Sequence, residues 1–209
     1  MGGRQAPSRY NRLLTSPNAP GVPPPGPHLR GLVFLARFEY VRREHGPAMV
    51  TAVMQALDEP DRGVLCGLDR REWYPFGTLV RLDRTIARLT APGDEAIYER
   101  IGRASARHRT EWLGPDARWH SIHGFLSRLA DQHPRLHSFG DAVYHRHGFR
   151  EGAISFSQYP ELDAGFCRAT LGYLRGAVEM LSGAPAAAFE RSCQCRGQES
   201  CQFWISWTP

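Results

Sequence analysis

The stretch FERSCQCRGQESCQFWISW, Phe189–Trp207, decides how the fold is interpreted, because it combines three cysteines, a polar loop and an alternating strand. Every second side chain of a strand points to the same face, and every second residue from Cys201 onward is apolar. Strands over Ala186–Cys193 and Cys201–Trp207 therefore predict a β-hairpin. Its tip would bring Cys193 close to Cys201.

The region before the hairpin changes its hydrophobic period twice. Residues 163–181 have apolar side chains at helical spacing, and Gly172 and Gly176 would allow this helix to approach another backbone closely. Residues 136–159 have glycine and serine breaks and short alternating runs such as AISFSQY, which predict strands. The order of helices, strands, helix and hairpin predicts an α+β fold, with an antiparallel β-sheet packed on one side by helices.

The chain divides into three predicted segments. Residues 1–30 contain the Pro/Gly-rich run SPNAPGVPPPGPH, which predicts a disordered arm. Residues 31–91 repeat helical spacing and predict an N-terminal helical subdomain, which ends at APGDE, a boundary with an aspartate helix cap. Residues 92–209 form the predicted main domain, which opens with long helices over residues 97–112 and 119–129.

Charge and composition exclude several classes of function. The net charge is +5, but four of the 26 basic residues lie in the acid-free residues 1–30, so the remainder has 22 basic and 21 acidic residues. Without a basic stripe, the sequence predicts no nucleic-acid binding. No apolar run approaches the roughly 18 residues of a membrane span, and no secretory signal is recognised. We expect a cytoplasmic protein, and the absence of lysine indicates a bacterial, GC-rich genome.

The five cysteines favour thiols or a metal site over a disulfide framework, because their number is odd and no secretory signal precedes them. Cys167 stands in the first turn of the helix before the hairpin, and Glu190 lies three residues before Cys193. Together with Cys201, these side chains could converge on a tetrahedral zinc ion that joins helix to hairpin. Alternatives stay open at this point: Cys195 rivals Glu190 as a ligand, the cysteines can be reactive thiols, and Cys167 can be a core residue.

The stretch Phe166–Trp207 resembles the C-terminal part of a V4R (4-vinyl-reductase-type) domain. The shared pattern is a cysteine, a Gly-Tyr-x-x-Gly helix, a Gly-x-Pro turn, Glu-x-x-Cys, a glycine-containing loop and Cys-x-Phe. The residues that carry it are Cys167, Gly172, Tyr173, Gly176, Gly183, Pro185, Glu190, Cys193, Gly197, Cys201 and Phe203. Within that family, the stretch is similar to the sensory domains of phenol- and toluene-responsive transcription activators. This resemblance implies a structural zinc held by Cys167, Glu190, Cys193 and Cys201, with Cys195 as the alternative ligand.

The same resemblance implies a non-catalytic regulatory or sensory module. Such domains bind a small hydrophobic or aromatic molecule between helices and sheet, so residues 92–209 would be a ligand-binding domain with a zinc hairpin. Aromatic side chains, some with a polar handle, are the candidates for the pocket, and core packing is their competing interpretation. They are Trp112, Trp119, His123, Phe125, Tyr144 and Phe156. Because the relatives dimerise, we expect a homodimer, with an unknown protein partner for its output.

Other interpretations remain beside this one. No G-x-S-x-G, P-loop or G-x-G-x-x-G motif is present, so we expect no enzyme. An enzyme that acts on a lipophilic substrate is the third alternative. A weaker likeness to V4R domains, in element order and pattern only, begins at Asp94. RGLVFLARFEYVRREHG and the later WYPF resemble the opening helices of an uncharacterised myxobacterial paralogous family, which is related to the V4R, haem-NO-binding and Bet3-type vesicle-tethering folds. The alternative function is a Bet3-like scaffold or adaptor acting with a small GTPase. His108 could ligate haem by analogy, but the sequence supports no haem pocket.

Overall fold

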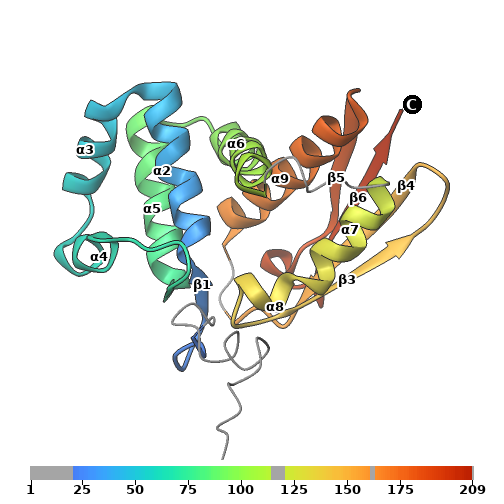
Figure 1. The fold of residues 1–209 in the computed structure, drawn as a ribbon, viewed down its shortest axis with the longest axis horizontal. Coiled ribbons are helices and arrows are strands. Elements are labelled where there is room, and N and C mark those ends of the chain that lie inside the picture. The colour runs from blue at the N-terminus through green and yellow to red at the C-terminus, as the bar shows by residue number, and fades with distance from the viewer. Residues whose placement is uncertain (1–20, 114–120, 161–162, 209) are drawn as a thin grey trace, which may run out of the picture.

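The structure is a computed structural model that describes residues 21–113, 121–160 and 163–208 of the 209-residue chain. It is an α+β fold in which helices pack against one face of an antiparallel sheet, with further helices in the N-terminal part (Figure 1). The predicted fold class is therefore confirmed. No helix among the described residues is both long and apolar enough to cross a membrane.

The main sheet has four antiparallel strands in the order β3-β4-β6-β5. Alternate residues of its central strands face the core, where Ile154 lies opposite Phe203 and both are buried. Val143 and Phe189 are half-exposed on the other face. The strands are β3 (Asp141–Arg146), β4 (Glu151–Ser157), β5 (Ala186–Ser192) and β6 (Ser200–Trp207).

Helices α7 and α9 pack on the inner face of the sheet, and α6 packs along α9. Glycines allow this last contact: a Cβ atom on Gly102 would lie 1.8 Å from the carbonyl oxygen of Ala169, and one on Gly172 would lie 2.1 Å from that of Glu99. The close approach predicted at Gly172 is thus present, with α6 as the partner. The helices are α6 (Ala96–Leu113), α7 (Ile122–Asp131), α8 (His133–Leu136) and α9 (Ala164–Ser182).

The N-terminal part consists of four helices and a two-stranded ribbon that had not been predicted. Leu29 and Arg30 are buried there, so residues 28–30, which the prediction assigned to the disordered arm, form part of the fold. Local composition did not indicate this strand, because it pairs with residues 73–75, which lie far along the chain. The elements are β1 (His28–Arg30), α2 (Gly31–His45), α3 (Pro47–Ala56), α4 (Glu59–Leu65), β2 (Trp73–Pro75) and α5 (Phe76–Thr90).

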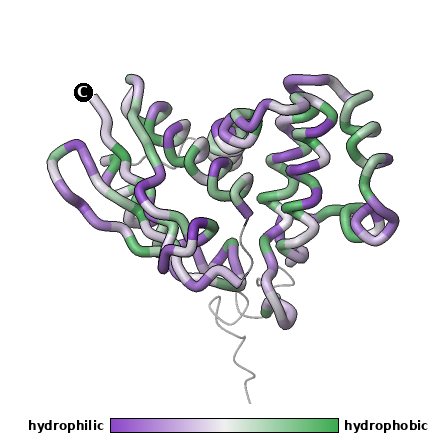
Figure 2. The backbone as a smooth tube through the Cα atoms, turned by 180° about the vertical axis from the view of Figure 1, so that it is seen from behind, coloured by the Kyte–Doolittle hydropathy of each residue, from purple (hydrophilic) through white to green (hydrophobic). Residues whose placement is uncertain are grey.

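Two hydrophobic clusters hold the described residues together. One lies between the sheet and helices α6, α7 and α9, and the other lies within the N-terminal helices. In Figure 2, green hydrophobic residues and purple hydrophilic residues are interspersed along the elements of both parts of the chain. Helix α6 takes part in both, because Ile97 and Ile101 belong to the N-terminal cluster and Ala106 belongs to the other. Phe166, in the first turn of α9, also reaches the N-terminal cluster.

Candidate functional site

The hairpin of β5 and β6 contains an irregularity that brings its ligand-type residues to one face. Glu190 lies opposite Phe203 and Ser192 lies opposite Gln202, so Arg191 is an extra, unpaired residue in β5. Regular alternation would place Glu190 and Cys193, three residues apart, on opposite faces of the strand. The β-bulge shifts the register by one residue, and both therefore face the core.

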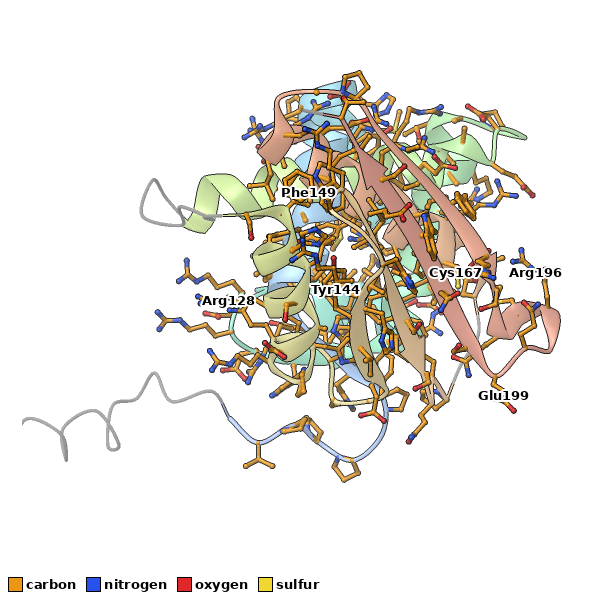
Figure 3. The ribbon with its side chains drawn as sticks, turned by 90° about the vertical axis from the view of Figure 1, so that its right-hand side faces the viewer. Arg128, Tyr144, Phe149, Cys167, Arg196 and Glu199 are labelled. Carbon is orange, nitrogen blue, oxygen red and sulfur yellow. The ribbon has the colours of Figure 1, made fainter. Side chains whose placement is uncertain are left out.

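Three cysteine sulfurs meet below this hairpin. Asp163 caps helix α9 by accepting a hydrogen bond from the backbone N–H of Phe166, which places Cys167 in the first helical turn. The Cys167 Sγ lies 3.6 Å from the Sγ of Cys201 and 3.8 Å from that of Cys193, and the last two are 3.9 Å apart. Figure 3 shows Cys167 beside the strands of the hairpin.

A carboxylate completes the cluster. One ligand atom from each of Cys167, Glu190, Cys193 and Cys201 lies within 4.8 Å of all the others. Glu190 Oε2 accepts from Arg196 Nη1 at 3.1 Å, whereas Oε1 is buried and has no hydrogen-bond partner among the described residues. A buried carboxylate oxygen without a partner is costly unless a cation or a proton satisfies it.

The donor set and its spacing fit a tetrahedral metal ion. A disulfide needs sulfurs about 2.05 Å apart, so none of the three pairs is bonded. Ligands at about 2.3 Å from a tetrahedral zinc ion would have their sulfurs about 3.8 Å apart, close to all three separations in this cluster. Four side chains would fill the coordination shell and leave no position for a reacting water.

The electrostatics of the thiols agree with a need for a cation. A hydrogen bond to Cys201 and burial raise the pKa of Cys167, and burial raises the pKa of Cys193 to about 12. The hydrogen bond from Cys167 lowers the pKa of Cys201 to about 6. Three buried thiolates therefore cannot form together at neutral pH without a cation, whereas a bound divalent cation would deprotonate them.

Burial and local hydrogen bonds distinguish the four residues of the cluster from Cys195. Cys195 is exposed and does not belong to the cluster. The backbone N–H of Gln194 donates to the Cys201 sulfur at 3.3 Å, and the N–H of Cys193 donates to the Gln198 side chain at 2.5 Å. These hydrogen bonds hold Cys193 and Cys201 in position, in the way that second partners orient the ligands of metal sites.

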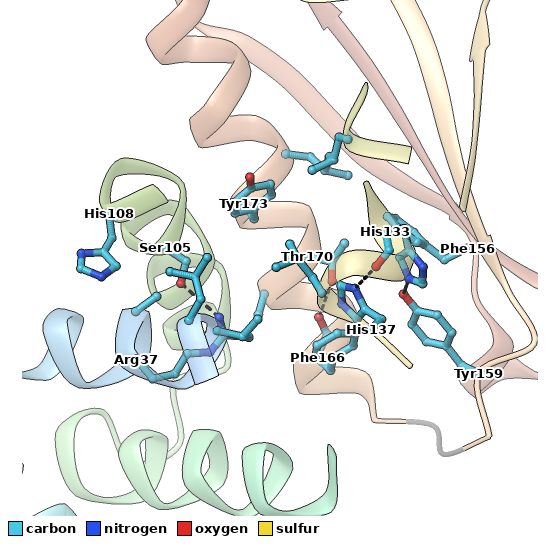
Figure 4. A pocket seen from close by; sticks show the side chains of 17 residues that line it. Arg37, Ser105, His108, His133, His137, Phe156, Tyr159, Phe166, Thr170 and Tyr173 are labelled. Atoms are coloured by element: carbon cyan, nitrogen blue, oxygen red, sulfur yellow. Dashed lines mark hydrogen bonds between the residues drawn. The ribbon is translucent and has the colours of Figure 1, made fainter. Parts of the chain in front are cut away.

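A pocket of about 120 Å³ lies beside α9, between α2, α6, α8 and β4. Most of its lining is apolar, including Ala36, Phe156 and Leu174. In Figure 4, Arg37 and Ser105 lie toward one end, and His133 and Tyr159 lie toward the other. The pocket thus has a mostly apolar lining with polar groups at both ends, and Thr170 and His137 lie between those ends.

Arg37 forms a buried network at its end of the pocket. Its guanidinium donates to both carboxylate oxygens of Asp83, at 3.2 and 3.3 Å, and to Ser105 Oγ at 3.1 Å. Arg37 and Asp83 are 5% and 2% exposed, respectively. Burial raises the pKa of Asp83, and the attraction of Arg37 opposes that rise. Arg37 and Asp83 therefore form a desolvated ion pair, in which removal of either residue would leave the other as an uncompensated buried charge.

His133 forms the opposite end. Its Nε2 lies 3.0 Å from the Tyr159 hydroxyl, and its ring stacks on His137 with centroids 4.1 Å apart. Burial lowers the pKa of His133 to about 4, so the imidazole is neutral at pH 7. Burial also raises the pKa of Tyr159. This end can therefore offer hydrogen bonds but no charge.

The predicted pocket residues lie in several places. Phe156 lines the pocket, and Phe125 is buried in the core between the sheet and its helices. His123 Nδ1 and the Tyr144 hydroxyl share a hydrogen bond of 2.6 Å, and neither residue lines the pocket. Two tryptophans were predicted as well: the side chain of Trp112 and all of Trp119 fall outside the described part of the chain.

Arg37, His133 and Tyr159 were not anticipated from the sequence. The prediction placed the pocket inside residues 92–209, whereas α2 of the N-terminal part forms one of its walls. One signal was present, because Arg37 stands on the same helical face as Phe34 and Val41. A charged residue on a core-facing stripe indicates a buried partner or a site.

No protein-family model matches this sequence, and no curated protein matches it. Among solved structures, the fold is shared with H-NOX proteins. An H-NOX protein from S. oneidensis in the Fe(II)NO ligation state has a TM-score of 0.70 and 12% identity, covering 87% of this chain and 100% of that one. An unliganded Fe(II) H-NOX protein mutant from K. algicida has a TM-score of 0.64 and 13% identity, covering 87% and 97%.

A third solved structure, described as modulating haem redox potential through protein-induced porphyrin distortion, has a TM-score of 0.66 and 14% identity, covering 86% of this chain and 100% of that one. At this level of identity the three likenesses establish the fold alone. The resemblance to 4-vinyl-reductase-type domains stays a prediction, since no family model matches.

Proposed function

We propose that this protein is a non-catalytic sensory module that binds a small hydrophobic or aromatic molecule in the pocket between α2 and α9. The pocket itself carries the proposal: it measures about 120 Å³ and is mostly apolar. An apolar cavity of about 150 Å³ in another protein binds benzene, so a single six-membered ring is the matching size. One H-NOX structure holds NO, so a protein of this fold accommodates a small ligand.

Haem does not fit this pocket. Pockets for drug-sized ligands measure about 300–1,000 Å³, and a porphyrin is at least as large as such ligands. The volume here is about 120 Å³, and the stacked rings of His133 and His137 form part of the wall. Although His108 also lines the pocket, the space beside it accommodates no macrocycle. We therefore assign no haem chemistry to the chain.

We also propose that Cys167, Glu190, Cys193 and Cys201 hold a structural zinc ion. Support comes from the sulfur separations of 3.6–3.9 Å and from the unsatisfied Oε1 atom of Glu190. Because these residues come from α9 and from both hairpin strands, bound zinc would join three elements and contribute to stability. It would supply no reacting water, in keeping with a module that is not an enzyme.

Toluene is a direct probe of the ligand proposal. At about 100 times its Kd it should stabilise the protein by about 2.7 kcal/mol, which corresponds to a rise in Tm of about 5–10 °C. Ala36→Leu fills the pocket wall and should abolish this rise, while Ala56→Leu, the same change at an exposed helix end, should preserve it. A Tm insensitive to toluene would contradict the proposal and favour the Bet3-like scaffold.

Two substitutions and native mass spectrometry test the zinc proposal. The wild type should contain one zinc ion per chain, and the same measurement reports whether the predicted homodimer forms. Cys201→Ser should lose zinc and more than about 3 kcal/mol of unfolding free energy. Cys195→Ser should keep the ion and change stability by less than about 0.5 kcal/mol. Zinc loss in Cys195→Ser would mean that the fourth ligand is wrongly assigned.

A further inference from the structure

We propose that Arg37 determines which ligand the pocket prefers: a neutral ring that carries a hydrogen-bond acceptor, over a plain hydrocarbon ring and over a carboxylate. This inference rests on the proposed function, because it needs a ligand in the pocket. It concerns a residue of the N-terminal helix α2, outside Phe166–Trp207, the stretch that resembles 4-vinyl-reductase-type domains.

The first step is an inventory of the Arg37 donors. A guanidinium carries five N–H groups. Three donate to Asp83 and Ser105, and the other two, one each on Nη1 and Nη2, have no acceptor among the residues that the structure describes. Because Arg37 is 5% exposed and lines the pocket, water satisfies these donors poorly. A ligand acceptor at this end of the pocket can satisfy one.

The second step concerns the neighbouring hydroxyl. Ser105 Oγ donates its only proton to the backbone carbonyl of Ile101, at 2.8 Å, and accepts from Arg37. It therefore has no hydrogen left for a ligand oxygen. Of these two groups, Arg37 is the one that can donate to a ligand, and its positive charge makes such a bond stronger than one between neutral partners. His108 also lines this end of the pocket, beside Ser105 in Figure 4, and it is unchanged in the variants described below.

The third step concerns net charge. Asp83 is 2% exposed and accepts two bonds from Arg37, so the pair carries no net charge into the pocket. A ligand carboxylate would lose its hydration and would lie close to the Asp83 carboxylate. A neutral oxygen, as in a carbonyl group, receives the hydrogen bond without that repulsion. The preferred ligand is therefore polar at one end but not anionic.

The test compares three probes of similar size on the full chain by isothermal titration calorimetry. Benzaldehyde, whose polar group only accepts, should bind about tenfold more tightly than toluene, since a hydrogen bond from a charged donor is worth at least about that factor. Benzoate should bind more weakly than benzaldehyde. Equal affinities for toluene and benzaldehyde, or tightest binding of benzoate, would overturn the inference and leave the proposed function intact. If none of the three binds, the proposed function fails as well.

A double variant assigns the preference to Arg37. Arg37→Met/Asp83→Leu removes both charges and so leaves no buried ion without its partner. It should retain toluene binding and bind benzaldehyde no more tightly than toluene. Arg37→Lys keeps a charge beside Asp83 but loses the planar fork, and it should reduce the preference as well. An unchanged preference in either variant would contradict the inference.

The matched control is Arg81→Met/Asp61→Leu. It removes another Arg–Asp pair of the N-terminal part, whose members do not line the pocket. The tenfold preference for benzaldehyde should survive in this variant. Loss of the preference there would show that it reflects the stability of the N-terminal helices instead of the donors of Arg37.

Discussion

Arg191 is the unpaired residue of the β5 bulge, between Glu190 and Cys193. It is exposed, and it does not belong to the cysteine cluster. Because the bulge absorbs this extra residue, Cys193 faces inward like Glu190 although the two stand three positions apart. The site therefore depends on the bulged backbone at Arg191 and not on its side chain.

Deletion of Arg191 tests this account. Glu190 and Cys193 would then stand two residues apart, so regular alternation without a bulge would place both on the inner face, and we expect the zinc content to remain at one ion per chain. Arg191→Ala keeps the bulge and should also keep the zinc. Elemental analysis of the two purified variants, with circular dichroism to verify folding, makes the measurement. Loss of zinc from the folded deletion variant would contradict this account of the register.

The pH dependence of stability should report His133. Burial lowers its pKa from about 6.5 to about 4, so between these values the unfolded chain binds a proton that the folded chain does not. His133 therefore leaves the free energy of unfolding unchanged above about pH 6.5 and lowers it by about 3 kcal/mol in total as the pH falls toward 4, because the buried imidazole resists protonation. The hydrogen bond from Arg81 lowers the pKa of Asp61, so the stabilising effect of that carboxylate is lost at a lower pH than the range in which His133 titrates.

Urea unfolding of the wild type and of His133→Gln, between pH 7 and pH 4, separates this contribution. The variant does not titrate in that range, so its free energy of unfolding should vary less with pH by up to the same 3 kcal/mol. Identical slopes for the two proteins would mean that His133 takes up its proton equally in the folded and unfolded states.

At the scale of elements, local patterns predicted the helices and strands well, and non-local contacts were missed. The alternation after Cys201 predicted β6, and the spacing in residues 163–181 predicted α9. Gly172 indicated close packing but could not identify Gly102 of α6 as its counterpart, because no local pattern encodes which helices meet. Strand β1 was missed for the same reason, since its pairing with β2 is long-range.

The α6–α9 contact gives a prediction at this scale. Gly102→Ala would place its Cβ 1.8 Å from a backbone carbonyl oxygen of α9, so the helices must move apart, and we expect a loss of about 3 kcal/mol or more. Gly63→Ala is the matched control in helix α4, where no atom lies within 4 Å, and it should be neutral or stabilise by up to about 1 kcal/mol. Thermal unfolding of both variants distinguishes a close contact from a general cost of the substitution.

At the scale of the whole molecule, the pocket lies where the N-terminal helices meet the C-terminal part. The clustering of Cys167, Glu190, Cys193 and Cys201 was predictable because the last three lie close in sequence and the whole set resembles a known pattern. The pocket was not, because its walls come from α2, α6, α8, α9 and β4, and their assembly depends on packing across the chain. Phe156 was anticipated, but Arg37 required the structure.

Helix α6 has a consequence for any attempt to dissect the chain. Ile97 and Ile101 pack into the N-terminal cluster, while Ala106, a little over one turn after Ile101, packs into the other. A fragment beginning at residue 92 would expose these isoleucines and Phe166 to water as a hydrophobic patch. A fragment ending at residue 91 would lack the helix that covers its core. The two parts are therefore expected to melt together, in one calorimetric transition, and neither half should remain soluble as an independent fragment.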